Sequence, residues 1–235
     1  MWEAVYAFTQ QGGRLMSMGG NGIYWRVAYR DDKPGVIEMR RAEDGARSWI
    51  AKPGEYYMSF NGEYGGMWWR CGRTPQPLVG NGFIAQGFDH SLYYCRHPDS
   101  FDPRVEFIFQ GIGKDERIGD FGLIGNGAAG IELDSSSRHY GTPPCALKLA
   151  MSENHMDSYL HVNEDIGHMY LSIGGQDDPA IHADLVFFET PNGGAVVSTG
   201  SIGWCSALFH NQYDNNVSQI TRNVLNRFLK SDAFG

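Results

Sequence analysis

The hydrophobic positions of the chain follow a helical period near its two ends and form short runs between them. Residues 2–11 carry Trp2, Val5 and Phe8 on one helical face and precede a Gly-Gly pair, which predicts a helix that stops there. Near the C-terminus, the segment 214–230 opens on capping Asp and Asn residues and then places apolar residues at helical spacing. It predicts a second helix.

The apolar runs between these helices have the length of β-strands. The run ADLVFFET is apolar almost throughout, as is typical of a strand covered on both faces. The turn sequence ETPNGG follows it and predicts a hairpin with the next apolar run. We expect strands at 14–20, 35–41, 82–88, 105–111, 145–151, 183–190 and 194–201.

The length of 235 residues fits one α/β domain, residues 1–235. The order of helix, Gly-Gly turn and strand at the N-terminus is an αβ unit that lacks its first strand. We therefore expect this chain to be part of a larger polypeptide or to be completed by another subunit. Two long segments, 42–81 and 112–144, are polar and glycine-rich, so we expect loops outside the core; loops of this length are usually functional.

Composition excludes several classes of protein. The net charge of -8 disfavours a broad nucleic-acid interface, which needs clustered Lys and Arg. No run of 18 apolar residues predicts a membrane span. The four cysteines are widely spaced and form no C-x-x-C pair, which disfavours a disulfide framework or a structural zinc site. We expect buried free thiols in a cytoplasmic protein.

The common nucleophile and metal motifs are missing from the sequence. It has no G-x-S-x-G elbow, and GNGAAG at 125–130 lacks the residues of a phosphate-binding loop. Cys205 lies near a predicted helix start, where its pKa could fall, but a structural cysteine is the simpler interpretation. The eight histidines show no H-x-x-x-H or H-x-H spacing, and the segment with His155 and His161 has the polarity of a solvated loop.

Glycine-rich corners precede three residues with oxygen donors. The corners GGNGIYWR (19–26) and NGEYGGMWWR (61–70) present Tyr24 and Tyr64, and GAAG precedes Glu132. Phenolate and carboxylate are hard anionic ligands that suit an ion such as ferric iron. From these residues alone, the alternative that the tyrosines are packing residues stays open.

The same segments carry a family resemblance that extends from about residue 12 to residue 230. GGRLMSMGGNGIYWRV, GEYYMSFNGEYGGMWWR, GAAGIELD, ADLVFFETPNGGAVVSTGSIGW and YDNNVSQITRNVLNRFL resemble the C-terminal domain of the N,N-dimethylformamidase large subunit family. The resemblance implies an α/β fold with a three-layer arrangement of a sheet and flanking helices. This fold is akin to the class I glutamine amidotransferase domain, which is flavodoxin-like, here with long loops.

The resemblance also implies a mononuclear ferric iron held by two tyrosines and one glutamate. These map to Tyr24, Tyr64 and Glu132, with Glu63 and Glu189 as other acidic residues in family-like segments. The family places a catalytic histidine shortly before the glutamate, whereas this chain has Gly130 and Ile131 in that stretch. His90 in GFDHS is the candidate substitute, and this departure leaves the exact substrate open.

The leading hypothesis is therefore a metal-dependent hydrolase of small amides. An iron-activated water would attack the carbonyl of a substrate such as N,N-dimethylformamide and release dimethylamine and formate. Glu189 or His90 would serve as general acid or base, and Asn21 would hydrogen-bond the developing oxyanion. Because the family works with a small helical subunit, we expect an oligomer.

Two other functions fit the same sequence. The domain could be a non-catalytic, amidotransferase-like binding or assembly module in which the tyrosines only pack. It could also be a thiol amidotransferase that uses Cys205. Metal analysis with an amide-hydrolysis assay separates the first from the leading hypothesis, and Cys205→Ala tests the second.

Overall fold

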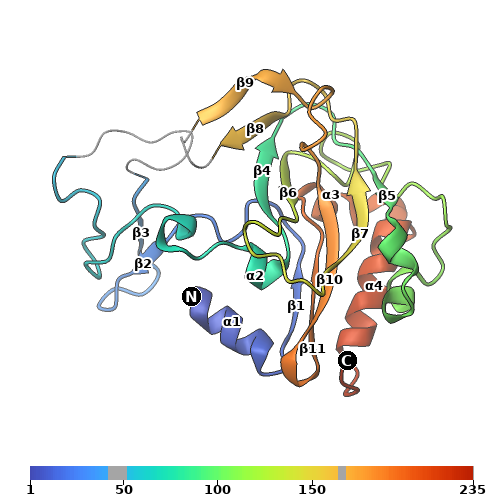
Figure 1. Cartoon of the computed structure of the whole chain (residues 1–235), viewed down its shortest axis with the longest axis horizontal. Helices are drawn as coiled ribbons and strands as arrows, with labels where there is room; N and C mark the ends of the chain where they lie inside the picture. The colour runs from blue at the N-terminus through green and yellow to red at the C-terminus, as the bar shows by residue number, and fades with distance from the viewer. Residues whose placement is uncertain (42–51, 164–167, 235) are drawn as a thin grey trace.

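The computed structural model describes residues 1–41, 52–163 and 168–234, and it shows a mixed α/β arrangement with three sheets (Figure 1). The main sheet has the order β1-β11-β10-β7-β5, in which β1 and β11 are parallel and the other neighbours are antiparallel. Its strands are β1 (Arg14–Ser17), β11 (Gly194–Ser198), β10 (Asp184–Thr190), β7 (Leu147–Ser152) and β5 (Tyr94–Arg96).

A second sheet lies above the main one in Figure 1, and a strand pair lies to its side. The second sheet is antiparallel, with the order β6-β4-β8-β9. Its strands are β6 (Glu132–Ser135), β4 (Gly82–Gln86), β8 (Leu160–Asn163) and β9 (His168–Gly174). The pair consists of β2 (Val27–Tyr29) and β3 (Ile37–Met39), antiparallel to one another.

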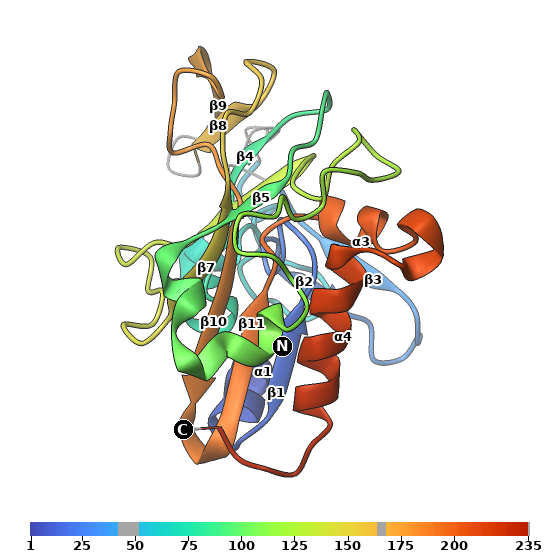
Figure 2. The same cartoon turned by 90° about the vertical axis from the view of Figure 1, so that its right-hand side faces the viewer.

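Two longer helices lie on opposite sides of the main sheet (Figures 1 and 2). They are α1 (Trp2–Gln10) and α4 (Asn216–Phe228), and α4 begins where the Asn215 side chain accepts a hydrogen bond from the Ser218 N–H. The shorter helices are α2 (Gln76–Val79) and α3 (Gly203–Ala207), with 3-10 turns at 68–71, 98–101, 103–109, 191–193 and 210–213. None of the described helices is long and apolar enough to cross a membrane.

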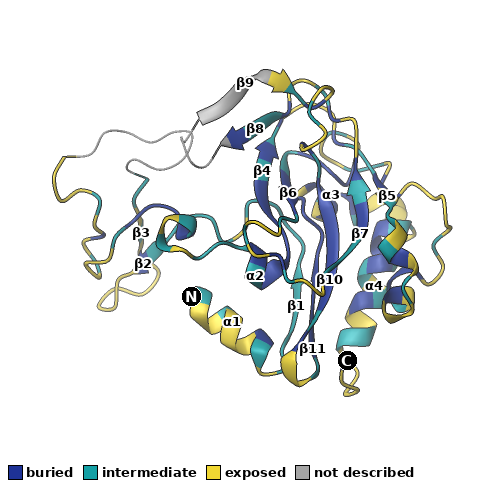
Figure 3. Ribbon diagram, viewed as in Figure 1, coloured by how far each residue is buried: buried dark blue, intermediate teal, exposed yellow. Residues whose placement is uncertain are grey.

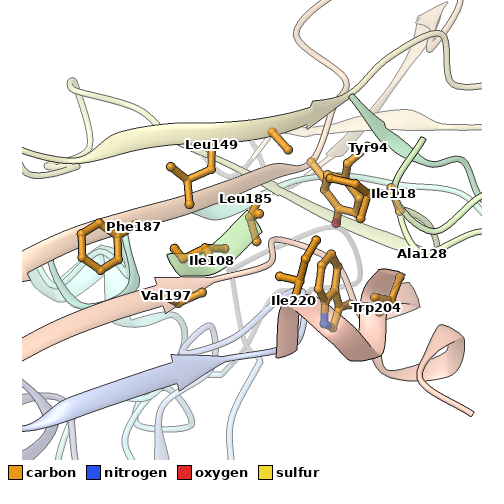
Figure 4. Close-up of a cluster of buried hydrophobic side chains, with 14 of the residues drawn as sticks. Tyr94, Ile108, Ile118, Ala128, Leu149, Leu185, Phe187, Val197, Trp204 and Ile220 are labelled. Carbon is orange, nitrogen blue, oxygen red and sulfur yellow. The ribbon is translucent and has the colours of Figure 1, made fainter. Parts of the chain in front are cut away.

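The core forms on both faces of β10, as its apolar sequence predicts. Leu185 and Phe187 face the cluster that includes Ile220 of α4 (Figure 4), while Val186 and Phe188 form a smaller cluster on the other face. All four of these β10 side chains are buried (Figure 3). Each contributes about 1.5–3 kcal/mol by leaving water, so the sheet is stabilised from both sides.

Several of the predicted elements are confirmed. The helix at the N-terminus, the helix at the C-terminus and the strands at 14–17, 37–39, 82–86, 147–152, 184–190 and 194–198 lie within or beside the expected ranges. The hairpin is also confirmed, because β10 and β11 pair antiparallel across the turn at 191–193. The glutamine amidotransferase-like architecture stays a prediction.

The strand expected at 105–111 is wrong. The segment is a helical turn at 103–109 that begins at Asp102, whose carboxylate accepts a hydrogen bond from the Arg104 N–H. Val105, Ile108 and Phe109 are buried, at a spacing of three and four residues. This spacing is helical, and the sequence reasoning took the apolar run as an unbroken strand.

Three expectations about burial are also wrong. The segments 52–81 and 112–144 supply core residues, including Met58, Met67, Leu78 and Ile118, while 42–51 lies outside the described residues. His155 is buried with its Nε2 2.8 Å from the Ser152 hydroxyl, so it does not lie in a solvated loop. The free cysteines are not buried: Cys71 is half-exposed, and Cys95, Cys145 and Cys205 are exposed.

Candidate metal centre

The corner at residues 19–26 connects β1 to β2 and presents Tyr24. Asn21 and Ile23 both have a positive φ of 54°. Asn tolerates this conformation, but a β-branched residue adopts it only at a cost of about 1–3 kcal/mol. Ile23 directly precedes Tyr24, so local backbone strain fixes the direction in which the tyrosine leaves the corner.

Asn21 holds this corner against β6, where Glu132 lies. Its backbone N–H donates to the Asp134 Oδ1 at 2.7 Å, and its side-chain Nδ2 donates to the Glu132 Oε1 at 3.0 Å. Gly20 makes the approach possible, because a Cβ atom there would lie 2.8 Å from the Glu132 carbonyl oxygen. Asn21 thus positions Glu132, a role that sequence reasoning did not assign to it; the oxyanion role stays a prediction.

The second corner pairs directly with the first. The Arg26 N–H donates to the Gly66 carbonyl at 2.8 Å, and the Trp68 N–H donates to the Tyr24 carbonyl at 2.9 Å. The pairing is antiparallel, with Trp25 opposite Met67. It places the two tyrosine corners side by side although they are about forty residues apart in sequence.

Arg26 adds a side-chain connection between the two corners. Its guanidinium donates to the Tyr64 carbonyl and forms an ion pair with Glu63. The Arg26 side chain is 11% exposed, and its guanidinium lies 5.2 Å from the Trp68 ring centroid. Glu63, one of the other acidic residues in the family-like segments, is therefore engaged by Arg26. The sequence signal for Arg26 was that both corners repeat the order Tyr, Trp and Arg.

The two tyrosine rings have different neighbours. Tyr24 packs edge to face on Phe83 of β4, with 5.4 Å between ring centroids, and β4 is the strand that pairs with β6. Tyr64 packs on Tyr56 at 6.3 Å and on Tyr57 at 5.6 Å. The first corner thus lies between the other two proposed ligands: it pairs with the corner of Tyr64, and it contacts Glu132 through Asn21.

Glu132 itself follows a strained turn. Ile131 has a φ of 69°, and the Glu132 N–H donates to the Gly130 carbonyl at 2.9 Å. A hydrogen bond across three residues with a positive central φ is a γ-turn, a rare and strained conformation of the backbone. Strain of this kind concentrates at functional sites.

The two acid-base candidates lie in different places. His90 is exposed in the loop after β4, and its neighbour Ser91 donates its N–H to the Gly125 carbonyl, so this loop borders the segment that leads to Glu132. Glu189 lies near the end of β10 at the hairpin, 3.9 Å from Arg104. The structure therefore places the loop of His90 beside the segment that leads to Glu132, and it places Glu189 at the hairpin end of β10.

Cys205 lies beside the first corner, but its environment does not favour a thiolate. Cys205 is exposed, but partial burial of its thiol raises the thiol's pKa, and the Sγ atom lies 2.9 Å from the Met18 carbonyl oxygen, to which it donates. A nucleophilic cysteine needs a lowered pKa and a cationic neighbour. This geometry disfavours the thiol amidotransferase alternative.

Few combinations of side chains in the described structure could hold a metal ion. Within residues 1–41, 52–163 and 168–234, no three His, Cys, Asp or Glu side chains gather closely enough for a metal site. A metal here would need the phenol oxygens of Tyr24 and Tyr64 beside Glu132. A cavity of about 320 Å³ runs along β4 and β6, and Phe83, Ile84 and His161 are among its lining residues. Phe83 also packs on the Tyr24 ring.

Comparison with known proteins identifies one family. A model of the family described as N,N-dimethylformamidase beta subunit-like, C-terminal, matches residues 1–215. The N,N-dimethylformamidase beta subunit of Paracoccus aminophilus is 45% identical over 231 residues, and that of an Alcaligenes species is 44% identical over 231 residues. Each alignment covers 98% of this chain and 30% of the relative. The chain thus spans about a third of the length of these curated relatives.

Proposed function

We propose that this chain, which belongs to the N,N-dimethylformamidase beta subunit-like C-terminal family, supplies the metal centre of a hydrolase of small amides. The substrate class is that of N,N-dimethylformamide, which water cleaves to dimethylamine and formate. One observation carries the proposal: a single corner presents Tyr24, holds Glu132 through Asn21 and holds the Tyr64 corner through Arg26.

The donor set fits a hard trivalent ion. Tyr24, Tyr64 and Glu132 would hold ferric iron as two phenolates and one carboxylate. The Asn21 hydrogen bond occupies one carboxylate oxygen of Glu132 and fixes the group's rotation, as outer-shell hydrogen bonds do for metal-binding carboxylates. A bound ferric ion would polarise the amide carbonyl and lower the pKa of water.

The remaining steps fall to the residues around this set. Phe83, a buried lining residue of the cavity, provides an apolar surface that suits N-methyl groups. Water adds its oxygen to the carbonyl carbon, the C–N bond breaks and the amine nitrogen takes up a proton. His90 is the better-placed candidate for that proton transfer, because its loop borders the segment before Glu132, whereas Glu189 faces Arg104.

The proposal extends to partners. Both relatives are named as beta subunits, which supports an oligomer with a second type of subunit; that this subunit is small and helical is what the family resemblance implies.

Removal of one phenol tests the proposal. Tyr64→Phe in the complete protein should weaken and shift the visible tyrosinate-to-iron absorption band, since Tyr24 remains as the other phenolate, and should lower amide hydrolysis at least tenfold. Tyr57→Phe is the matched control, because Tyr57 packs on the Tyr64 ring and pairs with it, yet it is not a proposed ligand. A colourless, iron-free wild-type protein would refute the proposal.

A non-catalytic binding or assembly module is the second candidate. The ring contacts of Tyr24 with Trp25 and Phe83, and of Tyr64 with Tyr56, are of the kind that packing tyrosines make. Under this alternative, Tyr64→Phe leaves metal content and activity unchanged and changes only stability. Elemental analysis and the amide-hydrolysis assay on the same preparations separate the two.

A further inference from the structure

A buried tyrosine outside the proposed ligand set contacts the strained turn before Glu132. We propose that Tyr159 is a positioning residue: its hydroxyl holds the γ-turn at Ile131 and thereby sets the direction of the Glu132 carboxylate. This inference rests on the proposed function, in which Glu132 holds the metal.

The hydroxyl of Tyr159 satisfies one of the two peptide groups of Ile131. The Ile131 N–H donates to the Tyr159 hydroxyl oxygen at 3.0 Å, and the Ile131 carbonyl accepts from the Gly87 N–H at 2.9 Å. Gly87 also makes room for Tyr159, because a Cβ atom at Gly87 would lie 2.5 Å from the Tyr159 ring. The peptide groups on both sides of the strained residue are thus fixed from outside the turn.

The residue before Ile131 is fixed in the same way. The buried hydroxyl of Ser201 accepts from the Gly130 N–H and donates to the Gly130 carbonyl, both at 2.8 Å. Ser201 therefore anchors the entry of the turn, and Tyr159 anchors its central residue. Of these two hydroxyl groups, that of Tyr159 is bonded to the residue next to Glu132.

The strained turn depends on such external hydrogen bonds. An isoleucine with φ of 69° returns to negative φ unless its surroundings over-determine its conformation. Return to negative φ would rotate the peptide plane that leads into Glu132 and re-aim its side chain. Tyr159 is suited to prevent this, because its ring is fully buried and its hydroxyl oxygen lies 3.0 Å from the Ile131 nitrogen, whose N–H it accepts.

Tyr159→Phe in the complete, iron-loaded protein removes only the hydroxyl. We expect iron retention against a chelator to weaken by about tenfold, the lower end of the effect of outer-shell partners on metal sites. We also expect the visible band to shift and the Ile131 amide to lose hydrogen-exchange protection. Thr190→Val is the control, because it too removes a buried hydroxyl bonded to the backbone: that of Thr190 donates to the Thr9 carbonyl at 2.8 Å, far from Glu132.

A rescue variant distinguishes positioning from general stability. Glycine adopts positive φ without strain, so Ile131→Gly in the Tyr159→Phe background should restore most of the iron retention. Unchanged iron retention and an unchanged band in Tyr159→Phe would overturn the inference, even with a lower melting temperature. So would a double variant that retains iron no better than the single one. A wild-type protein without iron refutes the proposed function instead, and the inference falls with it.

Discussion

A single added methyl group at Gly20 should disturb the candidate centre without changing any proposed ligand. The Cβ atom of Gly20→Ala would lie 2.8 Å from the Glu132 carbonyl oxygen and 3.0 Å from the Glu132 Cβ. Ordinary contacts begin at 3.4 Å, so β6 or the corner must move by about half an ångström. Both atoms belong to a paired strand and cannot rotate away.

The expected cost is about 1–3 kcal/mol of unfolding free energy, the usual penalty for overpacking. The same shift acts on the Asn21–Glu132 hydrogen bond, so we expect iron content and amide hydrolysis to fall by more than stability alone explains. Gly19→Ala is the matched control, because the space at its Cβ is open to 4 Å and its φ needs no glycine. Urea unfolding gives the stability of both variants, and elemental analysis gives their iron content.

The comparison has a clear negative outcome. If Gly20→Ala and Gly19→Ala unfold at the same urea concentration and hold the same iron, the close approach of the corner to β6 is not a feature of the folded protein. If only stability falls in Gly20→Ala, the contact is structural and does not orient Glu132.

Two further predictions follow from pKa shifts. Cys205→Ala should keep full amide-hydrolysis activity, because burial raises the pKa of the thiol; a loss of activity at normal stability would restore the thiol mechanism. Burial, with a smaller contribution from His182, lowers the pKa of His155 to about 3, against about 6.5 in the unfolded chain. Neutral His155 therefore makes its full contribution to the free energy of unfolding above pH 6.5. This contribution, up to about 5 kcal/mol, is lost as the pH falls toward 3. In His155→Gln, the free energy of unfolding should fall less between pH 6.5 and pH 4.5, a range above the titration of the carboxylates. If urea unfolding gives the same pH dependence for this variant as for the wild type, the prediction is contradicted.

The sequence predicts those elements whose partners are close in the chain or whose apolar pattern is unambiguous. The strand 184–190 and its hairpin with β11 follow from one apolar run and one turn sequence. The turn at 103–109 was missed because buried Val105, Ile108 and Phe109 lie in a run that also fits a strand. Pairings such as β4 with β6 join distant segments, and no local pattern contains them.

The candidate site shows the same division. The glycine corners mark Tyr24, Tyr64 and Glu132 as special, but the contacts that connect them lie between segments far apart in sequence. Asn21 and Glu132 are separated by 111 positions, and the hydrogen bond between them could not be inferred from either motif. Tyr159 carries no sequence signal at all, since its contribution is one hydroxyl at the end of a buried ring.

The backbone strain before Tyr24 and Glu132 bears on whether these residues are ligands or packing residues. Ile23 and Ile131 each hold a positive φ directly before the residue in question. A side chain that only fills space gains nothing from strain in its neighbour, because glycine or asparagine would make the same turn at lower cost. Strain persists where surroundings over-determine it, as hydrogen bonds from Tyr159 and Gly87 do at Ile131. The strained positions Ile23 and Ile131 are connected through the hydrogen bond from Asn21 to Glu132. They favour a site in which the directions of the Tyr24 and Glu132 oxygen atoms matter, even though the strain lowers the stability of the fold.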